Sequence, residues 1–434
     1  MIQEAKEAWN ALEGFRKNRN RCIDYTFGRQ WNDKIHIDGR TITEYEYILR
    51  EGNIPLKNNL IRRIVRNVLG VFRKQLPEML KIYGEELQGV VEENSLEELY
   101  ARTMEEFLIS GMAVHRKGFG IRGGKRGIFT DPVSPRDFFF STSSYDVRGR
   151  DINLIGQFHT VDFREWCEAF VTDPESYGKA RKLFTYGDRR RKITELWRRE
   201  LRPRYILHHE GKRVVSKCDD LSEVNQAKNH KKRWILDDVW RYYFLSEDGT
   251  VLCEGDSPYQ HRSHPYIVKC YPFLDGEIHS FVADMIDQQR YANRLITLYD
   301  WVIRASAKGV LLLPKGAVEP EELQYVADQW SRFNGVILYK SQAGVADPHQ
   351  VSGNTQNIGI SELLEIQLKM LEDVSGVTGT LQGNLSGNSV SGTLYNQQTQ
   401  NALTSLSDLM ATYEDFIKAC RDKDQSLLQQ TNFT

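Results

Sequence analysis

The sequence predicts an α+β fold in which a β-rich segment lies between two long helices. Residues 160–187 and 281–306 carry apolar side chains every three or four positions, which is the spacing of a helix. Residues 190–280 are rich in β-branched and aromatic side chains and contain the turn pairs Glu210-Gly211 and Asp248-Gly249. The chain has 434 residues, of which 40% are hydrophobic and 27% charged, so it can bury a core of several domains.

The N-terminal part is predicted to be mainly helical. Residues 3–27 show helical spacing, a Gly-rich loop runs from Gly28 to Gly52, and a second helix covers residues 58–77. Pro77 is expected to end this second helix, because proline cannot donate a backbone hydrogen bond. The apolar stripe of the second helix consists of Ile61, Ile64, Val65, Val68 and Phe72.

Two neighbouring segments carry opposite charge. All six charged residues between Gly52 and Pro77 are basic, whereas residues 85–106 contain eight glutamates and one arginine. Such segments can pair with each other within a subunit or between subunits. They can equally be two solvated helix faces, and the sequence leaves both interpretations open.

Short apolar runs separated by Gly and Pro predict β-hairpins from Gly111 to Phe140. Gly118, Gly120 and Gly123 match the GxGxxG pattern of dinucleotide-binding loops, but the residues that follow predict a strand where that loop needs a helix. We therefore predict a hairpin at these glycines. Further strands are expected in KITELWRREL, PRYILHHEGKRVV, VWRYYFLSEDGTVLCEG and HPYIVKCYPF.

The C-terminal part is predicted to contain two strands, in GVLLLP and GVILYK, and two helices, over residues 357–374 and 393–421. The segment between these helices, SGVTGTLQGNLSGNSVSG at residues 375–392, has many Gly and Ser and no charged side chain. This composition predicts a flexible loop.

Composition and motifs argue against an enzyme, a metal protein and a membrane protein. The net charge of −1 gives no sign of a general affinity for nucleic acid or membranes. The six cysteines include no CxxC pair, His261 and His264 have no further ligand at metal-binding spacing, and neither a P-loop nor a GxSxG turn is present. We expect no catalytic residue, no cofactor and no metal. The chain begins without the pattern of a signal peptide, and no apolar run could span a membrane, so synthesis in the cytoplasm is expected.

The densest basic stretch runs from Lys179 to Arg204 and holds eleven lysines and arginines against three acids. Cations for phosphates and aromatic rings for bases make a nucleic-acid-binding face one interpretation. On this interpretation the protein is a monomeric nucleic-acid-binding or nuclease-accessory protein that uses residues 179–204. The other interpretation is a solvated helix end followed by an edge strand that is protected by charge.

Several segments, taken in order, resemble the portal proteins of tailed bacteriophages, especially those of the short-tailed podoviruses. The likeness spans roughly residues 1–421, and polar residues soon after Asp422 predict a short crown instead of a long one. The segments that carry the resemblance are YTFGRQW, PLKNNLIRRIVRNVLGVFRKQLP, SGMAVHRKGFGIRGG, SPRDFFFSTSSYDVRGRDINLIG, ITELWRRELRPRYI, GEIHSFVADMIDQQRYANRLITLYDWVI and SGVTGTLQGNLSGNSVSGTLYNQQTQNAL.

The resemblance implies a portal fold with long stem helices, a β-rich clip insert, a mixed α/β wing and a short helical C-terminal region. The implied divisions are 1–159 (wing, N-terminal part), 160–189 (first stem helix), 190–275 (clip), 276–306 (second stem helix), 307–392 (wing, C-terminal part, with a tunnel loop at 375–392) and 393–434 (helical region with a short crown).

The resemblance also implies a ring of twelve copies at one capsid vertex of the virion, which serves as the channel for genome packaging and ejection. The implied partners are further copies of the chain, double-stranded DNA, the terminase large subunit, head–tail adaptor and tail proteins, and the major capsid and scaffolding proteins. A ring that held many phosphates tightly would stop DNA from sliding. We therefore expect weak contacts from a few cations and polar loops.

Three groups of functional residues are expected. The channel-loop candidates are Gly379, Gly383, Asn384, Ser386 and Asn388. The DNA-facing candidates on the stem are Lys179, Arg181, Lys182 and Arg290. The partner-binding candidates on the clip are Trp197, Arg198, Arg199 and Arg202, because Trp and Arg are enriched at binding hot spots.

Overall fold

A computed structural model describes most of the chain and divides it into two compact units. Unit 1 comprises Met1–Phe27, Ile61–Ile286 and Val374–Thr434, and unit 2 comprises Gly28–Leu60 and Asp287–Asp373. Both units contain helices and strands, so the predicted α+β class is confirmed. The described residues are 1–122, 124–141, 145–185, 190–209, 215–218, 230–308, 310–312, 320–331, 349–351, 359–377 and 404–432.

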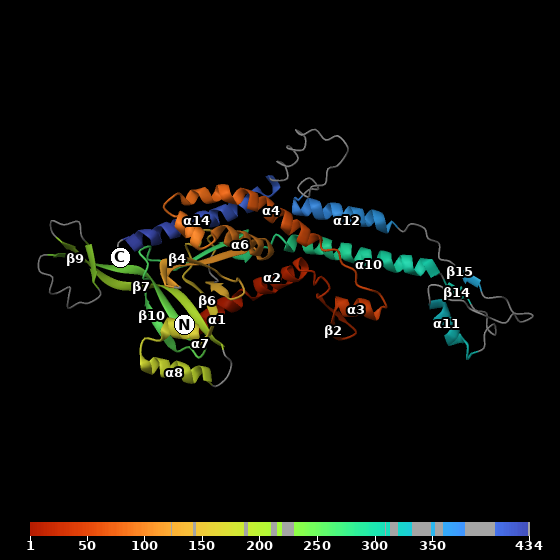
Figure 1. Cartoon of the computed structure of the whole chain (residues 1–434), viewed down its shortest axis with the longest axis horizontal. Helices are drawn as coiled ribbons and strands as arrows, with labels where there is room; N and C mark the ends of the chain where they lie inside the picture. The colour runs from red at the N-terminus through yellow and green to blue at the C-terminus, as the bar shows by residue number, and fades with distance from the viewer. Residues whose placement is uncertain are drawn as a thin grey trace, which may run out of the picture. The chain divides into compact units, whose positions relative to one another are not determined.

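The elements of unit 1 are drawn in Figure 1, where labels mark many of them. Its helices are α1 (Ile2–Ala11), α2 (Glu13–Thr26), α4 (Leu60–Leu80), α5 (Gln88–Glu93), α6 (Leu96–Ser110), α7 (Phe163–Phe170), α8 (Pro174–Thr185) and α14 (Ser407–Asn432), with 3-10 turns at Lys81–Tyr83 and Ala283–Met285. Its strands are β3 (Met112–Arg122), β4 (Lys125–Pro132), β5 (Phe138–Phe140), β6 (Leu154–Asp162), β7 (Arg190–His209), β8 (Val215–Cys218), β9 (His230–Ser246), β10 (Val251–Asp256), β11 (Tyr266–Cys270), β12 (Phe273–Leu274) and β13 (Glu277–Ile278).

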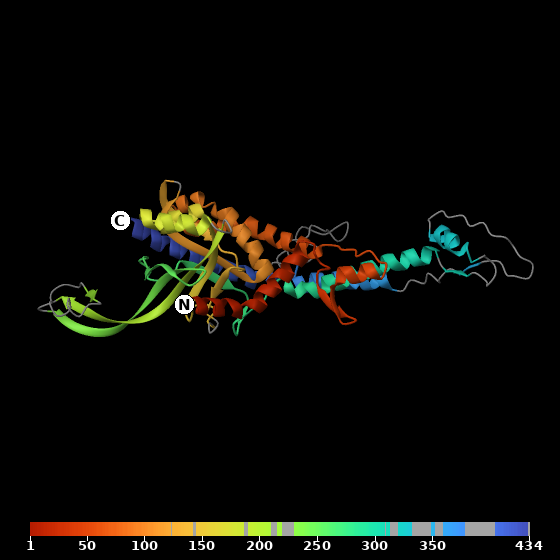
Figure 2. The ribbon, with the colours of Figure 1, turned by 90° about the horizontal axis from the view of Figure 1, so that it is seen from below.

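Two antiparallel sheets form the centre of unit 1. The larger sheet has the order β10-β9-β7-β6-β5, with β8 paired to the outer part of β7, and the smaller has the order β11-β3-β4. Strand β6 pairs with β7 only as far as Arg198, whereas β9 pairs with β7 as far as His209. Beyond Arg198, β7 and β9 therefore continue as a long ribbon, which curves away from the sheet in Figure 2.

Apolar side chains from both sheets meet in one core. Met112 and Val114 of β3, Phe138 of β5 and Tyr266 of β11 pack together with Trp197 of β7. Helix α1 covers part of the larger sheet through a second cluster that consists of Ala5, Ala8, Phe139, Leu196, Tyr243 and Leu245. Helices α7 and α8 cover another part through Trp166, Ala180 and Ile193.

Helix α14 completes unit 1 by packing on α4, α6 and the smaller sheet (Figures 1 and 2). The ring of Tyr413 lies 5.2 Å from that of Phe72 and 5.4 Å from that of Phe107. The tyrosine hydroxyl donates to the carbonyl oxygen of Tyr100 at 2.7 Å. The helix therefore joins the end of the chain to elements formed by its first third.

Unit 2 is built around two helices. It contains β1 (Lys34–Ile37), β2 (Arg40–Thr43), α3 (Glu44–Arg50), α10 (Ile286–Lys308), β14 (Val310–Leu312), α11 (Leu323–Ser331), β15 (His349–Val351) and α12 (Ile360–Ser375). Strand β14 follows α10 and pairs antiparallel with β15, which precedes α12. Because of this pairing, α10 and α12 lie side by side (Figures 1 and 2). In the sequence, β14, α11 and β15 come between these two helices.

Several sequence predictions are confirmed. Strands β3 and β4 form the hairpin expected at the GxGxxG pattern, with Gly120 opposite Gly127, while Gly123 lies outside the described residues. The Asp248-Gly249 turn joins β9 to β10, α10 matches the helix expected over 281–306, and β14 matches the strand expected in GVLLLP. Helices α12 and α14 match the two expected C-terminal helices with shifted bounds. The turn pair Glu210-Gly211 and the strand expected in GVILYK lie outside the described residues.

The basic segment at residues 52–77 and the acidic segment at residues 85–106 form ion pairs with each other. Arg62 of α4 pairs with Glu105 of α6 at 2.5 Å, and Arg73 pairs with Glu98 at 2.6 Å. The two segments therefore pair within the chain, in accordance with the first of the two interpretations.

The helix expected over residues 160–187 is wrong as a single element. Residues up to Asp162 belong to β6, and two short helices, α7 and α8, follow it. Pro174 causes the break, because a proline cannot donate a hydrogen bond to the carbonyl of Phe170 and instead suits the first position of a new helix. The carboxylate of Asp173 caps that helix by accepting from the backbone N–H of Ser176 at 2.8 Å.

Three further expectations are wrong. Pro77 does not end its helix, since α4 continues to Leu80. Proline has no backbone N–H, so one helical carbonyl group loses its donor, but Pro77 is exposed and water can solvate that carbonyl group. The loop expected over 28–52 contains the hairpin β1–β2 and helix α3. A left-handed Asp38-Gly39 pair turns that hairpin. The segment HPYIVKCYPF forms β11, which pairs with β3 and not with the other strands of the β-rich segment.

Candidate functional site

Trp197 lies in the core of unit 1. It is 3% exposed, and its ring packs 5.5 Å from that of Tyr242 and 6.0 Å from that of Tyr259. The indole N–H donates to the carboxylate of Glu195 at 2.9 Å. Most of the surface of Trp197 is thus used within its own subunit, and the part left for a partner is small.

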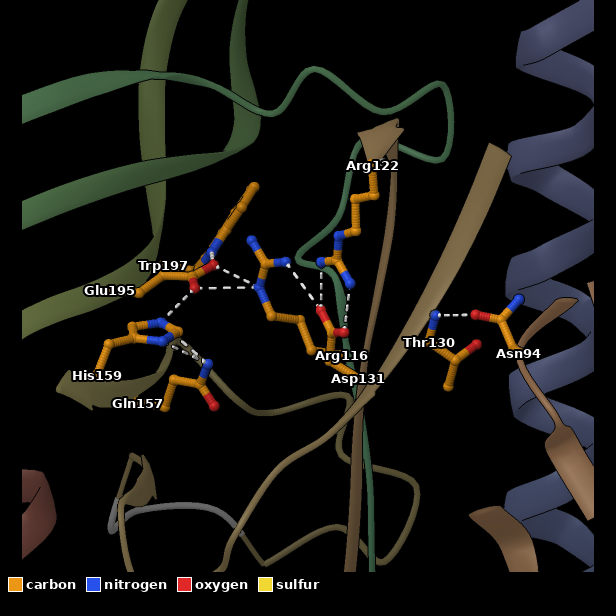
Figure 3. A network of polar contacts seen from close by, with 9 residues as sticks. All are labelled: Asn94, Arg116, Arg122, Thr130, Asp131, Gln157, His159, Glu195 and Trp197. Carbon is orange, nitrogen blue, oxygen red and sulfur yellow. Dashed lines mark hydrogen bonds and ion pairs between the residues drawn. The ribbon is translucent and has the colours of Figure 1, made fainter. Parts of the chain in front are cut away.

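Glu195 is the centre of a polar network that joins the two sheets (Figure 3). Its carboxylate is fully buried and accepts from Nε of Arg116, with distances of 3.0 and 3.1 Å to the two oxygens. His159 of β6 contacts the same carboxylate at 2.8 Å. Burial raises the pKa of Glu195, but the charge of Arg116 and the contacts with His159 and Trp197 outweigh it and lower that pKa to about 2.

The network continues to the surface through the smaller sheet. The guanidinium of Arg122 forms two hydrogen bonds with Asp131, at 2.6 and 2.7 Å, and Asp131 also faces Arg116 at 3.9 Å (Figure 3). These residues line a cavity of about 490 Å³ together with His159 and Glu195. Because each charge in this network has a partner of opposite sign, the arrangement is suited to holding two sheets together.

Arg198, Arg199 and Arg202 follow Trp197 along β7. Side chains alternate along a strand, so Arg198 and Arg202 share one face and Arg199 lies on the other. Each forms an ion pair within the chain: Arg198 with Glu4 and Glu200 at 3.2 and 3.3 Å, Arg199 with Asp238 at 2.6 Å, and Arg202 with Asp256 at 3.6 Å. The side chains are 33 to 38% exposed, so the guanidinium groups remain accessible to a partner.

Arginines further along the ribbon also form ion pairs with acidic side chains of the same chain. Arg204 pairs with Asp237 at 3.1 Å and with Asp256 at 2.9 Å, and Arg241 of β9 contacts Asp256 at 3.2 Å. The arginines at residues 198–204, the last part of the basic stretch, are therefore matched by acids that come mainly from other segments. This agrees with a strand protected by charge rather than with a nucleic-acid-binding face.

The four DNA-facing candidates are divided between the two units. Lys179, Arg181 and Lys182 are exposed on α8 of unit 1, where Lys179 pairs with Glu175 at 2.8 Å. Arg290 belongs to α10 of unit 2 and, with Arg294, contacts the buried carboxylate of Glu44. A shared DNA-facing surface for these four residues stays a prediction.

All five channel-loop candidates, Gly379, Gly383, Asn384, Ser386 and Asn388, lie outside the described residues. The structure describes the chain up to residue 377 and again from residue 404. Gly376 follows α12 with a φ of +65°, and its carbonyl accepts from the hydroxyl of Ser405 at 3.1 Å. This hydrogen bond joins these two described parts of the chain at Gly376 and Ser405.

His261 and His264 lie in the loop between β10 and β11, as expected for a polar loop. In the part of the chain that the structure describes, no group of three or more His, Cys, Asp or Glu side chains is arranged to hold a metal ion. Within the same residues, no helix is long and apolar enough to cross a membrane.

An apolar stripe on α12 was missed by the sequence analysis. Ile360 and Leu371 are buried on one side of the helix, whereas apolar side chains on another side are 42 to 52% exposed. The exposed residues are Leu363, Ile366, Met370 and Val374. Their spacing is helical, and the signal in the sequence was that α12 carries more apolar residues than one buried face requires.

Comparison with known families gives one match over nearly the whole chain. Residues 2–431 match the family described as Phage P22-like portal protein. A search of the curated proteins found no match.

Proposed function

Because the chain belongs to the P22-like phage portal family, we propose that it assembles with further copies of itself into a ring of twelve at the capsid vertex. The ring would form the channel through which double-stranded DNA is packaged and ejected. It would also be the docking site for the terminase large subunit and for the head–tail adaptor and tail proteins, within a shell of capsid and scaffolding proteins.

The observation that carries the proposal is the exposed apolar surface of unit 2. Besides the stripe on α12, the side chains of Leu298, Trp301 and Ile303 on α10 are 45 to 49% exposed. Monomeric proteins seldom expose a continuous apolar stripe like the one on α12, and oligomer interfaces commonly contain one. In a closed ring, each subunit would cover such a surface on its neighbour.

Unit 2 also supports a division of the portal fold different from the one expected from sequence. That expectation placed the clip at 190–275 between helices at 160–189 and 276–306, but the first of these helices is interrupted at Val171–Asp173. The helices α10 and α12 are 23 and 16 residues long, and they flank the small α/β segment with β14, α11 and β15. We infer that α10 and α12 are the stem helices and that the segment between them is the clip.

The partner-binding role of Arg198, Arg199 and Arg202 remains part of the proposal, while Trp197 acts as a support in the core. The ion pairs of these three arginines also argue against the alternative function, that of a monomeric nucleic-acid-binding protein. That function needs a surface whose cations are available for many phosphates. The paired arginines of the ribbon give it no support, so we do not propose it.

The proposal is tested by introducing charge into the stripe on α12. We expect the unaltered protein to elute at several hundred kilodaltons, whereas a single copy has a mass of 50.4 kDa. The variant Ile366→Glu/Met370→Glu should elute as single copies, because a buried unpaired carboxylate opposes the packing of apolar faces. Its far-UV circular dichroism spectrum should be unchanged, since both side chains are about half exposed.

The matched control is Lys369→Glu, which adds a carboxylate to the same helix at an exposed polar position. This control should form rings. If the unaltered protein stays monomeric at every concentration, the ring is refuted. If the stripe variant still forms rings, the interface lies elsewhere, and negative-stain images of those rings would then decide between the two divisions of the fold.

A further inference from the structure

The C-terminal half of α14 is held by polar contacts with the loop at residues 257–265. The ammonium group of Lys423 donates to the carbonyl oxygens of His264 and Tyr266. The side chain of Gln430 accepts from the backbone N–H of Gln260 at 3.1 Å and donates to the carbonyl of Pro258 at 2.9 Å. Both halves of the helix also bury side chains: Leu409, Tyr413, Phe416 and Ile417 in the N-terminal half, and Asp424 and Leu427 in the C-terminal half.

The loop contains two histidines whose surroundings suit only the neutral imidazole. Nδ1 of His261 accepts from the backbone N–H of Ser263 at 3.1 Å, so a proton on that nitrogen would face another N–H group. Nδ1 of His264 and Nε2 of His261 are buried without a hydrogen-bond partner. The ring of His264 packs edge-on against Trp240 at 4.7 Å, and that of His261 stacks on Tyr259 at 5.0 Å. An imidazolium in either position would lack an acceptor.

Burial and the charged group near these rings also favour the neutral form of both histidines. Burial, and then the charge of Lys423, lowers the pKa of His261 to about 4 and that of His264 well below its ordinary value. The tyrosines that contact the rings, Tyr259 and Tyr266, stay neutral because burial raises the pKa of each. The nearby carboxylate, Asp424, is already paired with Lys117 at 2.5 Å.

We propose that the 257–265 loop and the C-terminal half of α14 form an acid-sensitive latch. With His261 and His264 neutral, the loop holds residues 421–430 in place. With both protonated, the carbonyl and amide groups of the loop move away from Lys423 and Gln430, and this half of the helix loses its contacts with the loop while Asp424 keeps its pair with Lys117. The latch does not depend on assembly into a ring, because all its contacts lie within unit 1.

The direction of the effect follows from linkage. The latched state lowers the histidine pKa values, so the released state binds more protons between about pH 4 and the ordinary value of 6.5. The histidine contribution to latching is therefore at full strength above pH 6.5 and weakens as the pH falls, by roughly tenfold per pH unit for each histidine. Burial also lowers the pKa of Lys423 from 10.5 to about 7, so this group weakens latching as the pH falls through that higher range and changes little below pH 7. Asp424 acts in the opposite direction, because its pKa is raised, chiefly by burial. Variants of the histidines alone separate the two contributions.

Hydrogen–deuterium exchange of the full-length assembled protein, followed by mass spectrometry, tests the latch. Protection factors of residues 421–430 should fall between pH 7.5 and pH 5, while those of residues 409–417 in the same helix should not. The variant His261→Asn/His264→Phe should abolish the fall. Asn keeps an acceptor for Ser263, and Phe keeps a ring against Trp240, but neither side chain titrates.

The matched control is His36→Asn, at an exposed position of β1, which should leave the fall unchanged. The single variant His261→Asn should retain about half of the pH dependence, so the proposal stays testable if the double variant folds poorly. Equal protection of residues 421–430 at both pH values would overturn the latch. So would a full fall in the double variant.

Discussion

Two adjacent residues of β3 carry the buried charges on which the packing of unit 1 depends. Side chains alternate along a strand, so Arg116 and Lys117 point to opposite faces. Arg116 reaches Glu195 of the larger sheet, and Lys117 reaches Asp424 of α14. Burying a charge is costly unless it is paired, so each partner matters more than an exposed ion pair would. One strand thus fixes the position of the layers on both of its sides.

Replacing Glu195 with Gln should destabilise the protein by about 3 to 5 kcal/mol, because the charge of Arg116 would be left without its main partner. The measurement is the free energy of unfolding from urea denaturation at matched protein concentration. Glu168→Gln is the control, since its pair with Arg164 is exposed, and it should change the free energy by less than about 0.5 kcal/mol. Equal effects of both substitutions would contradict the role given to Glu195.

At the level of single elements, local signals in the sequence were sufficient for some predictions. The α10 helix follows from apolar periodicity, and the β3–β4 hairpin from glycines and alternation. Other elements depend on partners distant in the chain. The sequence could not show that β6 pairs with β7, or that the acids Asp237, Asp238 and Asp256 pair with arginines at residues 199–204. The burial of Trp197 was missed for the same reason.

The ribbon arginines are predicted to bind a partner without being needed for folding. Arg198→Glu/Arg199→Glu should weaken binding of the terminase large subunit or of the adaptor proteins, or open the ring, because the altered side chains would repel acids of the partner. Co-sedimentation with the purified partner and the mass of the ring measure this, and the melting temperature should change little, since the pairs are exposed.

The exchange variant Arg199→Glu/Asp238→Arg provides the control for this prediction. It restores an ion pair within the chain while the charge at position 199 stays reversed. If this variant binds its partner normally, Arg199 acts only within the subunit, and its proposed contact with a partner is wrong.

At the scale of the whole molecule, the family could be identified from the order of several weak segments, and the match over residues 2–431 confirms it. The exposed stripe on α12 could not be identified in the same way. Periodicity shows that a helix has an apolar face, but not whether the same chain or another one covers that face. Which side of α12 is free to meet another copy of the chain can therefore be seen only once the residues buried within one chain are known.

Deleting Gly383 to Ser389 is predicted to leave ring assembly intact and to abolish packaging or retention of DNA, if this segment lines the channel as proposed. Assembly should survive because the stripe on α12, which is the proposed interface, lies outside the deleted residues. Packaging of DNA into capsids with the altered ring is the measurement. The control Asn384→Ser/Asn388→Ser keeps length and polarity and should package normally. Normal packaging by the deletion ring would show that the segment is only a linker.

The pair between Lys117 and Asp424 has a consequence for synthesis of the protein. The two residues are separated by 307 positions, so the ribosome makes β3 long before α14. Until then the Lys117 ammonium must remain hydrated, because burying it alone would be too costly. The nascent β3–β4 layer should consequently stay open to solvent and to chaperones until translation is nearly finished. Chains that stop before Asp424 cannot close this layer, and such incomplete subunits would be excluded from a ring in which every copy must have the same shape.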